Sequence, residues 1–245
     1  MPRYAPPPTG LSYSFGPGPI TFAVKWLIIA NVAMFLVTEV YPPIIGYLGL
    51  RPEVVLERFF FWQPVTYLFL HGGVFHILFN MLGIWMFGVE LERRWGTHFF
   101  LKYYAITGIG AGIAVIVAGL LPFAATESTY YAITIGASGA LYGLLLAFAL
   151  YYPDRPILMF LLFPIQAKYF VMIIGAIAFL SAPGTQVSQA AHLGGLLVGY
   201  LYLRGGRGGM MAEVKYRYLK WKMNRLRRKF DVYSGGRSDW DRHVH

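Results

Sequence analysis

The sequence of 245 residues contains no cysteine. This absence excludes a disulfide framework, a thiolate nucleophile and a cysteine-bound metal centre. Charged residues are also scarce: they make up 13% of the chain, whereas hydrophobic residues make up 57%. An average soluble domain carries about 25% charged residues. The composition therefore indicates an integral membrane protein, and we find neither an internal repeat nor a second folded domain.

The cations that are present gather at one end of the sequence. The formal net charge is +10, and 12 of the 21 Lys and Arg residues lie between Arg204 and Arg242, beyond the last apolar run. Such clustering is typical of contact with an anionic membrane surface rather than with nucleic acid. We interpret residues 205–245 as a basic cytoplasmic tail. Residues 1–21, rich in Pro and Gly, are predicted to be a disordered cytoplasmic N-terminus that is not a cleaved signal.

Six apolar runs are long enough to cross, or nearly cross, a bilayer. They lie at residues 22–38, 74–89, 99–121, 138–152, 165–180 and 190–203. Lys and Arg occur in the links 93–102 and 154–168 but not in 122–137 or 181–189. The positive-inside rule therefore places both termini in the cytoplasm.

The first link, residues 39–73, is long and holds the aromatic run FFFW at 59–62. Aromatic side chains of this kind settle at the headgroup layer, so we interpret the link as an interfacial insertion on the outer side. The sequence thus predicts an all-α membrane protein, with a six-transmembrane-helix bundle at residues 22–204.

The fourth run begins within AITIGASGALYGLLLAF, which starts at Ala132 and contains Ser138. The run supplies about 15 helical residues, or ~22 Å, against a hydrocarbon core of ~30 Å. Its N-terminus must then lie below the membrane surface, where irregular backbone is tolerated only beside a wet cavity or protein. We expect Ser138 at the floor of such a pocket, at a helix N-terminus that suits a developing anion.

The sixth run contains AHLGGLLVG, in which His192, Gly195 and Gly199 are spaced to form one helical stripe. Gly139 begins a small-xxx-small pair on the fourth run, so two glycine-faced helices can approach closely. This packing would bring the Ser138 hydroxyl within hydrogen-bond reach of His192. A serine beside a base is an activated nucleophile.

The outer halves of these runs contain no Asp or Glu, so the sequence allows a dyad only. Tyr142, one turn after Ser138, is expected to stack on the imidazole and hold its orientation. The second run contains HGGVFHILFN, with His76 and Asn80 at i and i+4. We predict that both donate hydrogen bonds to an oxyanion. His71, just before them, is expected either to support the site or to be exposed at its rim.

Together, GASGALYG, AHLGGLLVG and HGGVFHILFN resemble the rhomboid family of intramembrane serine proteases. The resemblance extends to ELERRWG, with Glu92 four residues before a glycine, and to the region of Trp62, and it covers roughly residues 22–204. One departure is visible, because the family often follows this tryptophan with arginine and this chain has Gln63 followed by proline.

The resemblance implies a serine endopeptidase that cleaves peptide bonds in or near transmembrane segments of membrane proteins. Ser138 would attack, His192 would act as general base and then general acid, and water would hydrolyse the acyl-enzyme. The Ser138 backbone N–H would join His76 and Asn80 at the oxyanion, and Gly136 would support the site. No cofactor or metal is implied. The expected partners are transmembrane substrates and the lipid bilayer, and the compact plan favours the cell inner (plasma) membrane, with an organelle as an alternative.

Three other functions fit parts of the sequence. A catalytically inactive relative would bind membrane clients, although the chain keeps both Ser138 and His192. A transporter or channel would also place Ser, Asn and His within a membrane, but repeat symmetry and intramembrane carboxylates are missing. A zinc protease fits least, because HExxH is absent and His71, His76 and His192 lack the spacing of ligands.

Overall fold

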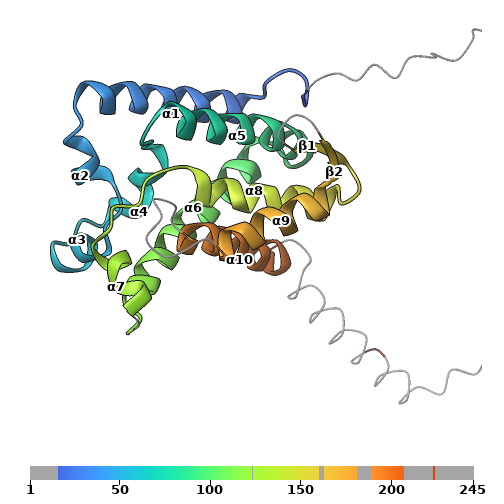
Figure 1. Ribbon diagram of the computed structural model, residues 1–245. Coiled ribbons are helices and arrows are strands. Elements are labelled where there is room, and N and C mark those ends of the chain that lie inside the picture. The colour runs from blue at the N-terminus through green and yellow to red at the C-terminus, as the bar shows by residue number, and fades with distance from the viewer. Residues whose placement is uncertain (1–15, 123, 160–162, 181–188, 207–222, 224–245) are drawn as a thin grey trace, which may run out of the picture. The chain divides into compact units, whose positions relative to one another are not determined.

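The computed structural model describes residues 16–122, 124–159, 163–180, 189–206 and 223, and this part of the chain is mostly helical (Figure 1). The long helices are α1 (Phe22–Val40), α5 (Val74–Trp95), α6 (Thr97–Gly119), α8 (Ser138–Tyr151), α9 (Ala167–Leu180) and α10 (Gln189–Gly206). Short helical segments in the links are α2 (Ile44–Leu48), α3 (Pro52–Glu57), α4 (Gln63–Thr66), the 3₁₀ helix η1 (Tyr67–Phe69) and α7 (Ala124–Tyr131).

Each of the six predicted apolar runs lies largely on one of the long helices. By length and composition, α1, α5 and α6 can cross a membrane, whereas α8 and α9 are apolar helices of 14 residues each. At ~1.5 Å per residue, α8 is about 21 Å long, shorter than a hydrocarbon core of ~30 Å. The prediction of an all-α membrane protein is confirmed. That six helices cross the bilayer stays a prediction.

Two short strands between α8 and α9 were not predicted. β1 (Pro156–Met159) pairs antiparallel with β2 (Phe163–Gln166), and Ile157 lies opposite Ile165. The fifth run was expected to begin as a helix at residue 165, but α9 begins only at Ala167. Pro164 lacks a backbone N–H and biases the residue before it toward extended backbone, which favours the strand.

The segment just before α1, at the end of the stretch 1–21 predicted to be disordered, makes hydrogen bonds to α5. The Arg93 guanidinium donates to the carbonyls of Pro17 and Pro19, and the Thr21 hydroxyl donates to the Glu92 carboxylate. Residues 16–21 are therefore held on α5 by partners more than 70 positions away, which composition does not reveal. Residues 1–15 and the basic tail, apart from residues 205–206 at the end of α10 and Met223, lie outside the described residues.

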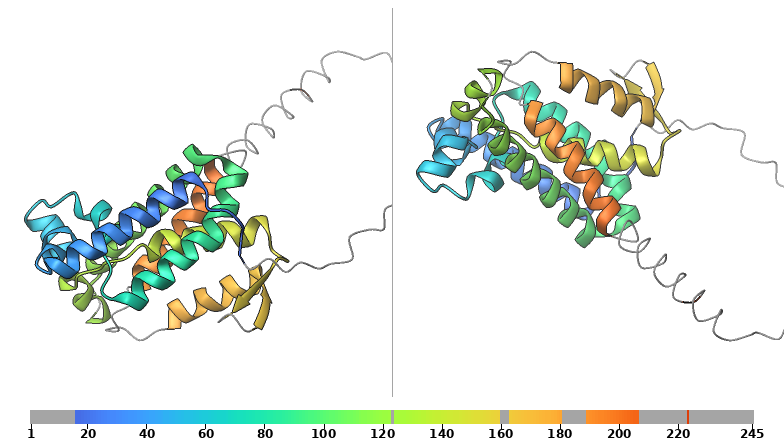
Figure 2. Two further views of the ribbon diagram at one scale, coloured as in Figure 1. Left: turned by 90° about the horizontal axis from the view of Figure 1, so that it is seen from above. Right: turned by 90° about the horizontal axis from the view of Figure 1, so that it is seen from below.

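Helix α8 lies among other helices, in contact with α5, α6 and α9 (Figures 1 and 2). Its contact with α10 depends on glycine, because a Cβ built on Gly195 would lie 2.0 Å from the carbonyl oxygen of Gly139. No side chain fits in that space. The predicted approach of two glycine-faced helices is present, and it sets the N-terminal turns of α8 and α10 side by side.

The first link folds into α2, α3, α4 and η1, and Gln63 ties it together from inside. Gln63 is fully buried; its Oε1 accepts the Arg51 N–H at 3.1 Å and its Nε2 donates to the Tyr47 carbonyl at 3.3 Å. An amide thus stands at the position where the family often has arginine. Phe59 and Phe61 stay exposed, at 65% and 66%, as expected for side chains that contact a lipid interface.

Candidate active site

Ser138 and His192 face each other across the contact between α8 and α10. Ser138 is the first residue of α8 and His192 lies in the first turn of α10. His192 Nε2 lies 2.8 Å from Ser138 Oγ, the distance of a normal hydrogen bond. For the hydroxyl to donate, the imidazole must carry its own proton on Nδ1. That atom is buried, without a hydrogen-bond partner among the described residues.

Tyr142 holds the plane of the imidazole. Its ring stacks on His192 with centroids 4.1 Å apart and an angle of 7° between the planes. Since Tyr142 is one helical turn after Ser138, both contacts to His192 come from the same face of α8. A flat ring beneath the imidazole leaves rotation within its plane as the main freedom, and the hydrogen bond to Ser138 opposes that rotation.

The chain reaches Ser138 through an extended segment that the first link holds. Leu50 and Thr134 exchange two backbone hydrogen bonds, at 2.9 and 2.7 Å, and the Gly136 N–H donates to the Tyr67 carbonyl at 2.9 Å. Gly136 has φ +122°, a conformation that favours glycine. No side chain caps the N-terminus of α8 at Ala137. This terminus therefore keeps the capacity for an anion that helix N-termini offer.

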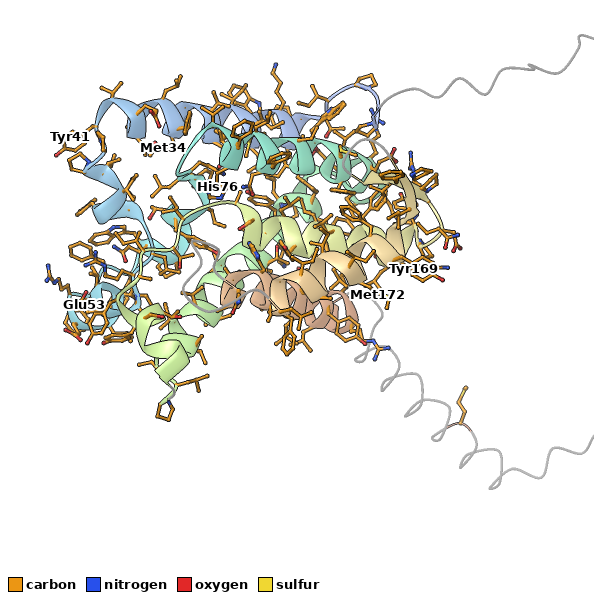
Figure 3. All side chains as sticks on the ribbon, viewed as in Figure 1. Met34, Tyr41, Glu53, His76, Tyr169 and Met172 are labelled. Atoms are coloured by element: carbon orange, nitrogen blue, oxygen red, sulfur yellow. The ribbon has the colours of Figure 1, made fainter. Side chains whose placement is uncertain are left out.

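His76 lies over Gly136, close to the Ser138 hydroxyl. A Cβ built on Gly136 would be 2.7 Å from His76 Nε2 and 3.8 Å from Ser138 Oγ. Figure 3 shows His76 at the start of α5, near the segment that leads into α8. Its Nδ1 accepts the Gly72 N–H at 3.3 Å. Nε2 then carries the ring proton and can donate toward the site.

Asn80 is buried, and its amide is engaged within its own helix. Nδ2 donates to the His76 carbonyl at 2.8 Å, and Oδ1 has no partner in the described part of the chain. One N–H of the amide group remains for another acceptor. The two predicted donors therefore differ: His76 lies beside Ser138, whereas the hydrogen bond of Asn80 stays within α5.

His71 lies inside the protein and not at an exposed rim. It is 1% exposed and meets His76 edge to face, with ring centroids 4.9 Å apart. Burial, and secondly the neighbouring His76, lower the pKa of His71 from 6.5 to about 4. His71 is therefore neutral at pH 7 and supports the His76 ring by contact.

Sequence reasoning missed Tyr67. Its carbonyl holds the Gly136 N–H, and its buried hydroxyl donates to the Gly108 carbonyl at 2.7 Å. A tyrosine four residues before His71 carried no signal by itself, because its partners lie 41 and 69 positions further along the chain.

Glu92 belongs to a different buried centre. Its carboxylate accepts the backbone N–H groups of Ala23 and Val24 at 2.9 and 3.1 Å, and the Thr97 hydroxyl at 2.7 Å. The Thr21 hydroxyl donates to it as well. Glu92 therefore joins the starts of α1 and α6 to α5. Within the described residues, no three His, Asp or Glu side chains gather as metal ligands would.

The fold and the site define a multi-pass membrane protein with a Ser–His pair enclosed among its helices. The family model of the Rhomboid domain matches residues 58–206, more than half of the sequence. The chain belongs to the rhomboid family.

Curated relatives match more than half of the sequence. The chain is 36% identical to YdcA of Bacillus subtilis over 146 residues, which cover 57% of this chain and 64% of YdcA. It is 32% identical to the rhomboid protease GluP of Bacillus subtilis over 152 residues, 62% of this chain and 27% of GluP. It is also 32% identical over 139 residues to the mitochondrial Rhomboid protein 1 of Saccharomyces cerevisiae, 55% of this chain and 38% of that protein. The chain thus spans less than two-thirds of the length of these relatives.

Proposed function

We propose that this protein is an intramembrane serine endopeptidase, with Ser138 as the nucleophile and His192 as the base. The observation that carries the proposal is the distance of 2.8 Å between His192 Nε2 and Ser138 Oγ. The neighbouring Tyr142 stack supports it, because a base that acts twice in one cycle needs a fixed orientation. Membership of a family that includes GluP, which is named a protease, supports it as well.

The reaction proceeds in two halves. His192 Nε2 takes the Ser138 hydroxyl proton as Oγ bonds to the carbonyl carbon of the substrate peptide. The carbon–nitrogen bond then breaks, and His192 returns the proton to the departing amine. Water, deprotonated by His192, attacks the resulting ester and releases Ser138. A dyad suffices for these steps, because each proton moves only between His192, Ser138, the amine and water.

The oxyanion of each tetrahedral intermediate would lie at the N-terminus of α8. The Ser138 backbone N–H and the His76 Nε2–H are the donors best supplied by the geometry, since His76 lies over Gly136. Asn80 contributes through its second N–H, and its bond to the His76 carbonyl fixes the helical turn that carries His76. Donors that are already oriented stabilise the anion more than the neutral carbonyl.

The substrates are transmembrane segments of other membrane proteins that can unwind near the outer membrane face. The N-terminus of the short helix α8 supports this placement, because a helix of 14 residues reaches only part of the way across the hydrocarbon core. We also propose that both termini lie in the cytoplasm of a cell whose inner membrane holds the protein.

Fluorophosphonate labelling tests the proposed activity. The purified protein should react at Ser138, as located by peptide mass spectrometry, and it should cut a test transmembrane substrate. Ser138→Ala should lose both reactions. A wild-type protein that binds transmembrane segments but neither labels nor cleaves would instead be a client-binding relative.

The absence of cysteine makes the orientation easy to test. Ser128→Cys, in the link before α8, should react with an impermeant maleimide in intact cells. Ser238→Cys, in the basic tail, should react only after the membrane is permeabilised. The reverse pattern would overturn the orientation without touching the proposed chemistry.

A further inference from the structure

We infer that Tyr67 is a positioning residue for Ser138, held between the first link and both sides of the nucleophile. This inference rests on the proposed serine-protease function. Tyr67 acts through Gly136 and Gly139, the residues on either side of Ser138 in the turn that carries it.

The backbone of Tyr67 fixes the approach to the nucleophile. Its carbonyl accepts the Gly136 N–H at 2.9 Å, two residues before Ser138. Two residues earlier again, Thr134 exchanges hydrogen bonds with Leu50. The extended segment is therefore tied to the first link at two places, and the Tyr67 bond is the one nearer to Ser138.

The side chain of Tyr67 fixes the residue after the nucleophile. A Cβ built on Gly139 would lie 3.3 Å from the Tyr67 hydroxyl oxygen, and one built on Gly112 would lie 3.0 Å from Tyr67 Cε1. The ring thus fills the space between α6 and the first turn of α8. Its hydroxyl donates to the Gly108 carbonyl at 2.7 Å, which fixes the ring along α6.

The geometry makes the site sensitive to small movements of this ring. The Gly139 carbonyl contacts Gly195 on the opposite side, so the first turn of α8 is enclosed between Tyr67 and α10. A shift of the ring would move Ser138 relative to His192 Nε2. Misplacement of reacting groups by about 1 Å costs on the order of 100-fold in rate, so a shift of about half an ångström should cost about tenfold.

Tyr67→Phe tests the inference, and Tyr103→Phe is its matched control. Tyr103 is equally buried, and its hydroxyl donates to the Gly143 carbonyl at 2.8 Å, on the turn of α8 after the one that carries Ser138. Each change removes one buried phenol-to-carbonyl bond and should lower the melting temperature in detergent to a similar extent. Only Tyr67→Phe should lower kcat and the rate of fluorophosphonate labelling, by about tenfold, with KM within about twofold of wild type.

Gly112→Ala moves the same ring without removing a bond. The new methyl group would lie 3.0 Å from Tyr67 Cε1, closer than ordinary contact, while alanine favours the helix relative to glycine. We expect kcat to fall although the melting temperature does not. Gly175→Ala on α9 is the control, because its Cβ would meet Leu196 at an ordinary 3.5 Å.

The outcomes separate this inference from the proposed function. If wild type labels at Ser138 but Tyr67→Phe labels no more slowly than Tyr103→Phe, Tyr67 is merely structural and the inference fails. Labelling of Gly112→Ala at the rate of Gly175→Ala would lead to the same conclusion, even if Tyr67→Phe did not fold. If wild type is not labelled at Ser138, the proposed function fails and the inference fails with it.

Discussion

Two buried polar centres of this protein use the same structural feature, the N-terminus of a helix, in opposite ways. At the start of α1, the Glu92 carboxylate occupies the terminus and accepts the N–H groups of Ala23 and Val24. At the start of α8, no side chain caps the terminus at Ala137, and Ser138 lies there beside His192. One terminus already holds an anion from its own chain, whereas the other is uncapped and, in the function we propose, would bind the anion that forms during the reaction.

The two centres also differ in how many of their polar atoms have hydrogen-bond partners. Glu92 accepts four hydrogen bonds, from two backbone N–H groups and two threonine hydroxyls. In the part of the chain that the structure describes, His192 Nδ1 and Asn80 Oδ1 are buried without partners. Buried polar groups are normally satisfied, and those that are not call for an explanation. The Glu92 centre thus has its hydrogen bonds made within the protein, whereas the centre around Ser138 keeps buried polar atoms that a bound substrate could contact.

The largest expected effect is the loss of the dyad. Ser138→Ala and His192→Ala should each lower kcat on a test transmembrane substrate by about 10⁴-fold or more, because the two residues act as one unit. The double variant should lose no more than the singles, and all three should melt as wild type does within a few degrees. Substantial turnover by purified Ser138→Ala would refute the proposed mechanism.

The next effect concerns the two residues predicted to stabilise the oxyanion. His76→Ala should lower kcat by about 10²-fold with KM little changed, because one prearranged donor is lost. Asn80→Ala should lower kcat less and the melting temperature more, since its buried amide also bonds the His76 carbonyl one turn earlier in α5.

Measurements of kcat and melting temperature for both variants distinguish a role in stabilising the oxyanion from a role in stabilising the fold. A near-normal kcat in both variants would show that neither His76 nor Asn80 stabilises the oxyanion. Equal losses of kcat, with no loss of stability, would instead show that the amide of Asn80 serves the oxyanion directly.

Glu92→Gln tests the Glu92 centre. A glutamine keeps one acceptor oxygen but presents an NH₂ group to donors, so about two charge-assisted hydrogen bonds are lost, or about 3 kcal/mol of unfolding free energy. The melting temperature should fall, while the fluorophosphonate labelling rate per folded molecule stays at the wild-type value. A labelling rate that falls as far as in His76→Ala would show that the two centres are not independent.

The predicted geometry is present where helical spacing carried the signal. Helical spacing placed the glycine of α10 at residue 195 opposite that of α8, and the contact of Ser138 with His192 followed from it. The pairing of Tyr67 with Gly136 could not be predicted, because it depends on how the first link folds back over α8. The i, i+4 spacing of His76 and Asn80 likewise does not show that the Asn80 amide bonds the His76 carbonyl of its own helix.

Pairing also explains the elements that were missed. The hairpin of β1 and β2 forms because the two strands pair with each other. Four-residue strands are too short for the periodicity of their side chains to predict that pairing. The order in residues 16–21 comes from Arg93 and Glu92, far away in the sequence. Long apolar helices, by contrast, can be predicted from the sequence, because apolar residues recur in every turn.

The smallest expected effect is a dependence of stability on pH that comes from His71. Its pKa is about 4 in the folded protein, mainly because of burial and secondly because of His76, and near 6.5 when unfolded. The unfolded chain therefore binds more protons between pH 6.5 and 4. His71 therefore does not lower the free energy of unfolding above that window, but lowers it by up to about 2 kcal/mol at pH 5. The melting temperature in detergent should fall from pH 7 to pH 5, and it should fall less in His71→Gln, which cannot be protonated. His98→Gln, a change at an exposed histidine, should keep the wild-type slope. If His71→Gln keeps that slope too, His71 does not become protonated on unfolding as its burial requires.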